Sequence, residues 1–366
     1  MATNNNDKTL NVPHLRFPEF TGEWEKCKFK DVCKVETGNK NTQDKVENGL
    51  YPFYVRSQNV ERINSWSFDG EAILTAGDGV GVGKVFHYSI GKIGVHQRVY
   101  ILNDFKCDGK YLYNYFSNRF YNRVKRLSAK NSVDSVRMEM ITEMPLSLPS
   151  LEEQSKIGCL LSLLEERITT QNKIIEDLKK LRSAISLNVL HSSTWKQFKI
   201  KDIAQIGRGR VISFIEISQQ KNPTYPVYSS QTSNDGIMGY LDDYMFEGEY
   251  ISWTTDGANA GTVFYRDGKF NCTNVCGLLK LRNGFDTHFV SLILAEATKK
   301  YVSINLANPK LMNNTMGNIQ ICLPEFEEQK RISIVFKKLQ ELLDVQKILL
   351  NQYSKQKQCL LRQMFI

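Results

Sequence analysis

The chain has 366 residues, of which 41% are hydrophobic and 24% are charged. These values are ordinary for a folded protein, and they exclude a disordered or collagen-like chain. At about 150 residues per domain, the length predicts two or three domains. The 48 Lys and Arg residues exceed the 39 Asp and Glu residues, and the resulting charge of +9 favours a polyanionic partner.

The sequence has no apolar run close to the roughly 20 residues that span a bilayer. Its first residues lack the apolar core of a signal peptide. The eight cysteines are scattered among apolar neighbours, and Cys272-x3-Cys276, the spacing nearest to a metal site, has no third ligand at a suitable distance. We therefore expect a soluble cytoplasmic protein with reduced cysteines, no metal site and no membrane contact.

The sequence contains an internal duplication. Residues 70–86 match residues 248–264 at eight of 17 positions, where composition alone predicts roughly one match. Four more anchors recur in the same order, at offsets between 171 and 178: Trp24 and Trp195, Tyr51-Pro52 and Tyr225-Pro226, Asp108 and Asp286, Leu148-Pro149-x-x-Glu152-Glu153-Gln154 and Leu323-Pro324-x-x-Glu327-Glu328-Gln329. The chain is therefore two copies of one unit with loop insertions.

Each copy opens with a segment that predicts a compact domain of mixed α/β (α+β) class. We place these two domains at 1–147 and 193–322. Short β-rich runs lie between Gly, Asn and Asp turns, and in the second copy they predict strands over 249–253, 262–266 and 278–282. One helix follows in each copy, near 108–126 and 286–302.

Each copy closes with a predicted helix of roughly 38 residues, within 148–192 and 323–366. A proline near the start and glutamates in the first turn are typical of helix beginnings. Gly158, the one glycine inside these helices, predicts either a bend or close packing. Apolar residues at alternating steps of four and three predict a coiled-coil seam. The seam residues are Ile157, Leu161, Leu164, Ile168, Gln171, Ile175 and Leu178, and Ile332, Phe336, Leu339, Leu343, Gln346, Leu350 and Tyr353.

A polar residue, Gln171 or Gln346, stands in the middle of each seam. The first helix leads the chain away from the first domain, and the end of the chain should return to it. We therefore expect two antiparallel helices that separate the domains by a fixed spacing about a pseudo-two-fold axis. The alternative is a pair of surface helices packed separately on their own domains, each with an exposed glutamine.

The order of domain, Leu-Pro-x-x-Glu-Glu-Gln helix, second domain and second helix resembles the specificity (S) subunit of type I restriction–modification systems. The resemblance covers nearly the whole chain. It implies two target-recognition domains that each read one half of a split sequence in double-stranded DNA. It also implies that the paired helices fix the unread gap and dock two modification subunits, which methylate adenine N6.

The same resemblance places all catalysis on partner subunits. The modification subunits would carry S-adenosylmethionine, and restriction subunits would use ATP and Mg²⁺ to translocate and cleave DNA. It implies that this chain carries no catalytic residue and no cofactor of its own. The setting would be the cytoplasm of a bacterium or archaeon, in association with the nucleoid.

Two other classes of function stay open at this point. The segment Gly77–Lys84 is similar to a phosphate-binding loop, but a Walker A motif needs Gly where Asp78 stands and Ser or Thr where Val85 stands. The second copy has lost the lysine, so a turn between two strands fits both copies. A cryptic nucleotide enzyme that uses 77–84 is one alternative. The other is a scaffold whose repeated domains bind protein or glycan.

DNA contacts are expected from two kinds of residue. Phosphate contacts require clustered basic side chains, and the candidates are Arg119, Arg123, Lys125, Arg126 and Lys130, with a thinner counterpart in Lys299, Lys300 and Lys310. Base readout requires Arg, Asn, Gln or Ser on loops that enter the major groove. The candidates on such loops are Asn39, Lys40, Arg56, Ser57 and Gln58, then Arg208, Arg210, Ser229, Ser230, Gln231 and Asn313. The loops 128–132 and 308–314 belong to the same group. The copies diverge most in these loops, as expected if each reads a different half-site, although any single residue could simply be solvated.

Overall fold

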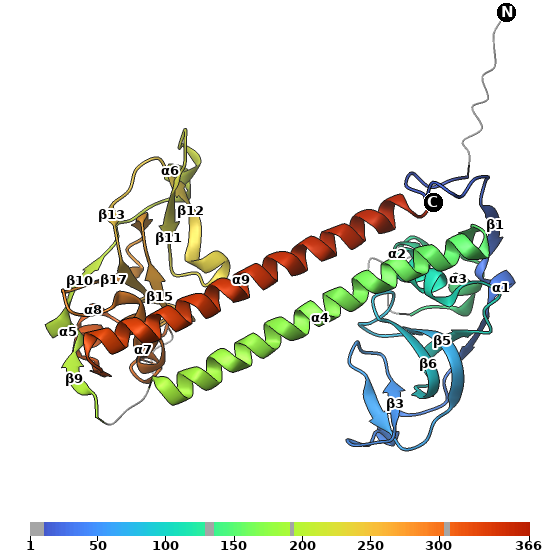
Figure 1. Cartoon of the computed structure of the whole chain (residues 1–366), viewed down its shortest axis with the longest axis horizontal. Helices are drawn as coiled ribbons and strands as arrows, with labels where there is room; N and C mark the ends of the chain where they lie inside the picture. Colours follow the sequence, from blue (N-terminus) through green and yellow to red (C-terminus); the bar gives the residue numbers. More distant parts are fainter. Residues whose placement is uncertain (1–10, 129–134, 191–193, 304–307) are drawn as a thin grey trace, which may run out of the picture. The chain divides into compact units, whose positions relative to one another are not determined.

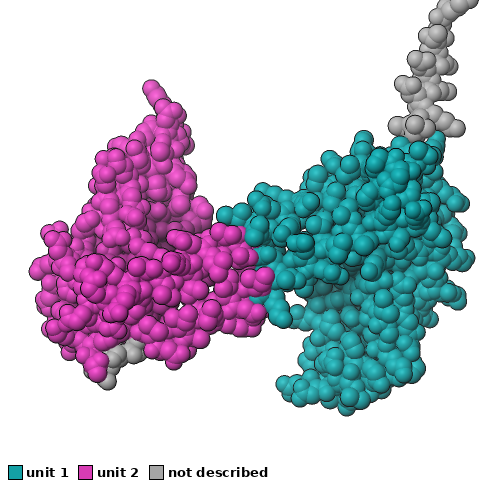
Figure 2. All heavy atoms as spheres, in the orientation of Figure 1, with its two compact units in different colours: residues 1–173, 347–366 teal, residues 174–346 magenta. Residues whose placement is uncertain are grey.

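The computed structural model describes residues 11–128, 135–190, 194–303 and 308–366. The chain packs as two compact units, one of residues 1–173 with 347–366 and the other of residues 174–346 (Figure 2). Each unit contains one mixed α/β domain and part of two long helices, α4 (Leu151–Val189) and α9 (Phe326–Gln363) (Figure 1). The boundary between the two units falls inside α4 and α9 and not at the ends of the domains. The domain boundaries drawn from the sequence therefore stay a prediction.

The first unit is built on a six-stranded sheet. Its strands are β2 (Lys34–Thr37), β3 (Tyr51–Tyr54), β4 (Glu61–Ile63), β5 (Phe68–Ala76), β6 (Phe86–Val95) and β7 (Val99–Asn103). The order across the sheet is β2-β7-β5-β6-β3-β4. All neighbours are antiparallel except β3 and β6, which are parallel. A separate antiparallel pair joins β1 (Glu25–Lys28) to β8 (Pro145–Leu148), the strand that leads into α4.

One helix, α2 (Gly109–Leu127), lies at the centre of the hydrophobic core of this domain and contributes six of its buried side chains. Tyr111, Phe116 and Phe120 are buried against Ile73 of β5 and Leu102 of β7. Asp108 caps the helix, because its Oδ1 accepts the backbone N–H of Tyr111 at 2.8 Å. The smaller helices are α1 (Phe29–Val32), α3 (Met138–Thr142) and the 3₁₀ turn η1 (Thr42–Asp44).

The second unit repeats this plan with a broken strand. The counterpart of β6 is divided into β15 (Val263–Arg266) and β16 (Lys269–Cys272) by a turn at Gly268, whose φ is +94°. The other strands are β10 (Ala204–Arg208), β11 (Tyr225–Tyr228), β12 (Ile237–Leu241), β13 (Phe246–Glu247), β14 (Tyr250–Thr254) and β17 (Cys276–Leu281). They form two four-stranded sheets, β10-β17-β14-β15 and β12-β11-β16-β13. The parallel pair recurs between β11 and β16.

The helices of the second unit also match those of the first. Asp286 caps α7 (Thr287–Ala297) through the N–H of Phe289, at 2.7 Å. Strand β9 (Lys196–Lys199) pairs with β18 (Gln320–Leu323), which leads into α9. The remaining helices are α5 (Ile200–Ile203), α6 (Phe214–Ser218), α8 (Asn313–Asn318) and the 3₁₀ turns η2 (Ser233–Gly236) and η3 (Thr298–Lys300).

The predicted elements agree with this fold to within a few residues. Strands expected at 249–253, 262–266 and 278–282 are β14, β15 and β17, and both domain helices begin after the aspartates that repeat in the sequence. The duplicated mixed α/β architecture is confirmed. One helix was predicted too long: α7 ends at Ala297, where the chain tightens into η3, and the expected end at 302 is wrong.

Within each unit, segments of α4 and α9 run antiparallel. In the first unit Lys357 of α9 pairs with Glu165 of α4, and Phe365 at the end of the chain packs on Tyr111 with ring centroids 5.3 Å apart. In the second unit Arg182 Nη1 donates to Gln340 Oε1 at 2.8 Å. The predicted direction of the helices is therefore confirmed in both units, and the alternative of separately packed helices is not supported.

The predicted seam is the buried side of these helices. Every seam residue from Ile157 to Leu178 and from Ile332 to Tyr353 is buried or half-buried, whereas the residues between them are mostly exposed. Gln171 is itself buried. A shared glutamine layer stays a prediction, because Gln171 belongs to the first unit and Gln346 to the second.

Gly158 marks close packing. A Cβ atom on this residue would lie 2.8 Å from Asp108 Oδ1 and 2.9 Å from the backbone nitrogen of Tyr111. The glycine therefore allows α4 to approach the first turn of α2 directly. Its equivalent in the second unit is Ser333, a buried small residue whose Oγ lies 3.0 Å from His288 Nδ1.

Candidate nucleic-acid interface

Four connections of the first domain meet at one end of its sheet. The backbone N–H of Lys40, after β2, donates to the Val95 carbonyl at the end of β6, at 3.0 Å. The N–H of His96, after β6, donates to the Tyr54 carbonyl at the end of β3, at 3.0 Å. The N–H of Gly77, after β5, donates to the Arg98 carbonyl at 2.8 Å. The fold therefore gathers residues that are far apart in the sequence into one polar surface.

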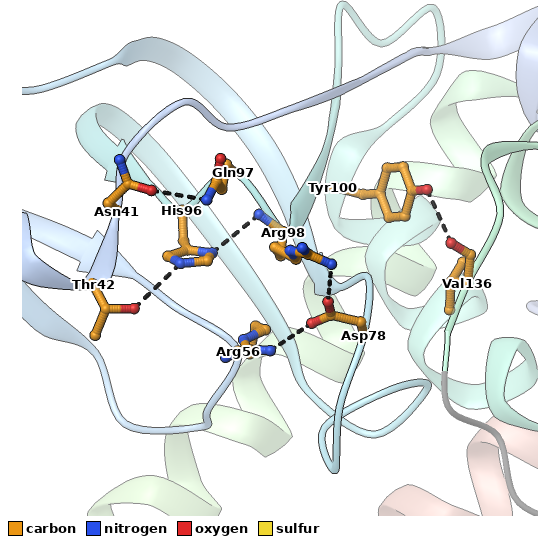
Figure 3. Close-up of polar contacts among 9 residues, drawn as sticks. All are labelled: Asn41, Thr42, Arg56, Asp78, His96, Gln97, Arg98, Tyr100 and Val136. Carbon is orange, nitrogen blue, oxygen red and sulfur yellow. Dashed lines mark hydrogen bonds and ion pairs between the residues drawn. The ribbon is translucent and has the colours of Figure 1, made fainter.

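Asp78 lies at the centre of this surface, between two arginines. Its Oδ1 accepts from Arg56 Nη1 and its Oδ2 from Arg98 Nη1, both at 2.7 Å (Figure 3). The side chains of Arg56 and Arg98 are 47% and 61% exposed, while that of Asp78 is 20% exposed. Partial burial opposes ionisation of Asp78, but the hydrogen bonds from the two guanidinium groups outweigh it and lower the pKa of the carboxyl.

The glycine-rich segment 77–84 is the turn that positions Asp78. It connects the antiparallel strands β5 and β6, as predicted. A Cβ on Gly81 would lie 2.4 Å from the Arg56 carbonyl oxygen, and Gly79 has a φ of +78°. These glycines let the turn pack against the backbone of Arg56, so their structural role accounts for the similarity to a phosphate-binding loop.

His96 supports the same cluster through its two ring nitrogens. It is buried, its Nδ1 accepts the backbone N–H of Arg98 at 3.0 Å, and its Nε2 lies 3.3 Å from Thr42 Oγ1 (Figure 3). Burial, and then the charge of Arg56, lowers the pKa of His96, so the neutral ring is favoured at pH 7. A cavity of about 550 Å³ opens beside this cluster, and Thr42, Arg56, Ser57, Asp78 and His96 contribute to its lining.

Two further contacts brace this surface. Gln97 Nε2 donates to Asn41 Oδ1 at 2.8 Å, and the Tyr100 hydroxyl donates to the Val136 carbonyl at 3.0 Å (Figure 3). Among the predicted base-reading residues, Lys40 donates through Nζ to Ser65 Oγ at 2.9 Å. Asn39, Ser57 and Gln58 are exposed.

The second domain has the same backbone frame with different side chains. The N–H of Arg210 donates to the Cys272 carbonyl at 3.1 Å, so Arg210 occupies the place of Lys40. The N–H of Thr255 donates to the Val275 carbonyl at 3.0 Å, which places Val275 where Arg98 stands. Ser230 follows the repeated tyrosine by two residues and corresponds to Arg56. The pair of exposed arginines is therefore confined to the first domain.

Four predicted residues of the second domain take part in three contacts. Arg208 Nε donates to Asn313 Oδ1 at 2.9 Å, and Lys310 forms a β-bridge with Asp256. Arg210 forms an ion pair with Glu216 that uses both terminal nitrogens of its guanidinium. These contacts bring four candidates to the loop end of this domain.

Ser229, Ser230 and Gln231 lie in a loop that a buried arginine pins in place. Arg266 Nη1 donates to Asp235 Oδ2 at 2.8 Å and its Nη2 to the Asp235 carbonyl at 2.9 Å. The guanidinium also stacks 3.6 Å from the centroid of the Tyr228 ring. Arg266 therefore orders the loop from inside and offers no charge at the surface.

The basic cluster of α2 divides into structural and exposed members. Arg123 donates to the carbonyls of Met140 and Glu143, each at 2.8 Å, so its guanidinium holds α3 against α2. Arg119 lies over the Tyr115 ring, 5.3 Å from its centroid. Lys125 and Arg126 are exposed, as are Lys299 and Lys300 in η3. Lys130 and most of the loop 128–132 lie outside the described residues.

Sequence reasoning missed Asp78 and Arg98. A signal was available in the short link between β6 and β7. There the first copy has His96-Gln97-Arg98, and the second copy has Thr273-Asn274-Val275 at the aligned positions. Over the described parts of the chain, no three His, Cys, Asp or Glu side chains are grouped as a metal site. Across those same residues, every helix is too short or too polar to cross a lipid bilayer.

Comparison with known proteins identifies the family. The family model described as the type I restriction modification DNA specificity domain matches twice, at residues 21–180 and 192–352. The chain belongs to this DNA specificity family. Each match contains one domain and part of the long helix that follows it, so the duplication read from the sequence is the duplication of a specificity domain.

Named relatives agree with this assignment, and a solved structure agrees with the fold. A Mycoplasma pneumoniae protein named as a type I specificity subunit is 36% identical over 197 residues, which are 53% of this chain and 82% of the relative. The specificity subunit of the type I restriction enzyme MpnII from the same organism is 43% identical over 141 residues, 38% of this chain and 42% of the relative. The type I S subunit of M. genitalium matches the fold with a TM-score of 0.77 at 18% identity, over 97% of this chain and 99% of that one.

Membership of the specificity family gives the chain its role and excludes others. Proteins of this family recognise DNA sequence within type I restriction–modification systems, and they are non-catalytic, since catalysis belongs to partner subunits. The family therefore decides against the nucleotide enzyme and the DNA-independent scaffold. The choice of base-reading residues within the interface stays a prediction.

Proposed function

We propose that each domain of this chain reads one half of a bipartite DNA target for a type I modification complex. The observation that carries this proposal is that the two domains share backbone contacts but differ in the polar side chains of their loops. The two copies share backbone contacts at the loop end of their sheets, yet Arg56 and Arg98 of the first correspond to Ser230 and Val275 of the second. A common scaffold with different polar side chains suits two different half-sites.

The gap between the half-sites is proposed to be set by α4 and α9. The Glu165–Lys357 contact of the first unit and the Arg182–Gln340 contact of the second support this, because each joins a segment of α4 to a segment of α9. DNA half-sites recur with a helical turn of about 34–36 Å, so a spacer of fixed length would select a fixed number of unread base pairs.

The partners are proposed to be two modification subunits docked on the helices, with restriction subunits joining them. S-adenosylmethionine, ATP and Mg²⁺ would be bound by those partners, and this chain would supply sequence recognition alone. The complex would work in the cytoplasm, at the nucleoid. The net charge of +9 supports an electrostatic contribution to DNA binding.

The test is a selection from random DNA. The chain is purified in complex with its modification subunits and mixed with duplexes that contain a randomised stretch of about 20 base pairs. The proposal predicts enrichment of one split motif with a constant gap, and binding that weakens steeply with salt. Retention of DNA without any enriched motif, or no salt-dependent retention, would favour a scaffold that binds protein or glycan.

A further inference from the structure

We infer that Arg56 and Arg98 are base-reading residues that select guanine in the half-site of the first domain, and that Asp78 positions them. The inference rests on the proposed function, since it names what one of the two domains reads. It concerns the cluster of Figure 3, all of whose interacting atoms lie in the first unit.

Both guanidinium groups keep the donors that a guanine requires. A guanidinium has five N–H donors on a rigid planar fork. Asp78 engages Nη1 of Arg56 and Nη1 of Arg98. The Nε and Nη2 atoms of both side chains make no hydrogen bond to another described residue. That free edge presents two parallel donors, which match the O6 and N7 acceptors of guanine in the major groove.

The cluster is held in place before DNA arrives. Gly77 and His96 fix the backbone of Arg98 from its carbonyl and its N–H, at 2.8 and 3.0 Å. The turn at Gly81 packs directly on the carbonyl of Arg56. A side chain that is already held in its bound position loses less conformational entropy when it binds. Both arginines are therefore positioned in a way that a freely solvated arginine is not.

Asp78 also favours a base over a phosphate as the target of these arginines. Its carboxylate lies 2.7 Å from each guanidinium and is kept ionised by them. A phosphate bound to either arginine would approach this negative charge and be repelled by it. Guanine O6 and N7 carry only partial charges, so they meet much less repulsion.

Other arginines of the interface lack this combination. The terminal nitrogens of Arg210 are engaged by Glu216, and Arg266 is buried with all three of its nitrogens hydrogen-bonded. In the second domain the positions of Arg56 and Arg98 are taken by Ser230 and Val275. The selection of guanine by a held arginine pair is therefore confined to one half-site.

The experiment compares methylated motifs produced by variants of the full chain. The chain and its modification subunits are expressed in a host without other adenine methylation, and genomic N6-methyladenine is mapped by single-molecule sequencing. The variants are Arg98→Ala, Arg56→Ala, Arg98→Lys and Asp78→Asn. The matched control is Arg137→Ala, since Arg137 is an exposed arginine of the same unit with no side-chain partner among the described residues.

The inference predicts a guanine in one half of the wild-type motif. Arg98→Ala and Arg56→Ala should each lower discrimination at a guanine position about 10-fold or more. The other half of the motif and the control should be unchanged. Asp78→Asn should relax the same positions less strongly. Arg98→Lys separates base from phosphate contact, because lysine keeps the charge but loses the bidentate edge.

Three results would overturn the inference while leaving the proposed function intact. These are a first-domain half-site without guanine, an unchanged motif in both alanine variants, or a uniform loss of methylation that Arg98→Lys restores with the motif intact. If Arg98→Ala abolishes all methylation, Arg98→Lys decides: restored methylation with an intact motif overturns the inference, and a relaxed guanine position supports it. A wild-type chain that directs no split motif, with active modification subunits, would instead contradict the proposed function.

Discussion

The side-chain oxygen of Gln154 accepts the backbone N–H of Asp108 at 2.9 Å, and this bond joins the first turn of α4 to the start of α2. The amide nitrogen of Gln154 donates to the Pro149 carbonyl at 2.8 Å. Gln329 makes the same two bonds in the second unit, to the N–H of Asp286 at 3.0 Å and the Pro324 carbonyl at 2.8 Å. The glutamine and aspartate that repeat in the sequence are thus one structural joint between recognition domain and helix.

Replacement of this glutamine should destabilise the unit that contains it. Gln154→Leu leaves the half-buried N–H of Asp108 and the buried carbonyl of Pro149 without these partners, and such losses cost about 1–3 kcal/mol. Urea denaturation of the purified chain measures the change in the free energy of unfolding. Gln358→Leu is the control, since Gln358 is exposed on α9, and it should change stability by less than about 0.5 kcal/mol. Equal effects of the two substitutions would show that the joint contributes nothing.

Gly158→Ala should also be destabilising, although alanine favours helix by up to about 1 kcal/mol. The new Cβ would lie 2.8 Å from Asp108 Oδ1 and 2.9 Å from the Tyr111 nitrogen. Overpacking of this kind costs about 1–3 kcal/mol, so a net loss is expected. Thermal unfolding compares it with Ser155→Ala, on the exposed side of α4. A stabilised Gly158→Ala variant would contradict the close approach of α4 to α2.

Stability of the second unit should depend on the protonation of His288. Burial, followed by the charge of Lys337, lowers the pKa of His288 to about 4, against the opposing effect of Asp286. An unfolded histidine has a pKa of about 6.5, so below that pH the unfolded chain binds a proton that the folded chain excludes. The free energy of unfolding should therefore fall as pH drops from about 6.5 to 4.

His288→Phe isolates this contribution. Phenylalanine keeps a ring beside Tyr265, whose ring centroid lies 5.1 Å from that of His288, but it cannot take up a proton. The difference in melting temperature between variant and wild type should shift in favour of the variant as pH falls through this window. If the difference in melting temperature between variant and wild type stays constant from pH 7 to pH 4, His288 does not take up a proton on unfolding.

Insertion of one heptad into each of α4 and α9 should lengthen the unread gap. Seven residues add about 10.5 Å to a helix, close to the rise of three base pairs of DNA at about 3.4 Å each. Because a heptad preserves the seam, both half-sites should stay the same. Mapping of the methylated motif measures the gap directly. A changed half-site, or an unchanged gap, would contradict the assignment of these helices as the spacer.

The fold was predictable where the sequence repeats itself. The paired motifs around Gln154 and Gln329, and the caps Asp108 and Asp286, predicted both long helices and both domain helices near their observed starts. These residues repeat because each copy needs the same joint. Gly158 could be assigned to close packing only from the fold, since a bend fits the sequence equally well.

The interface was predictable only in part. Arg56 and Lys40 are polar residues on loops that follow strands, and the sequence therefore suggested them. Arg98 joins Arg56 only because β5 lies between β6 and β7, and the order of strands in a sheet depends on pairings distant in sequence. Arg123 shows the opposite error of composition-based reasoning: it lies in a basic run, but backbone carbonyls engage its guanidinium. Charge alone does not distinguish these cases.

Methylome sequencing is the most direct measurement of the central claim. Host cells expressing the modification subunits are compared with and without this chain, and N6-methyladenine is mapped across the genome. The claim predicts a split motif, methylated in both halves, that is present only when the chain is expressed. An identical methylome in both strains, with the modification subunits shown to be active, would contradict the role of this chain in DNA specificity.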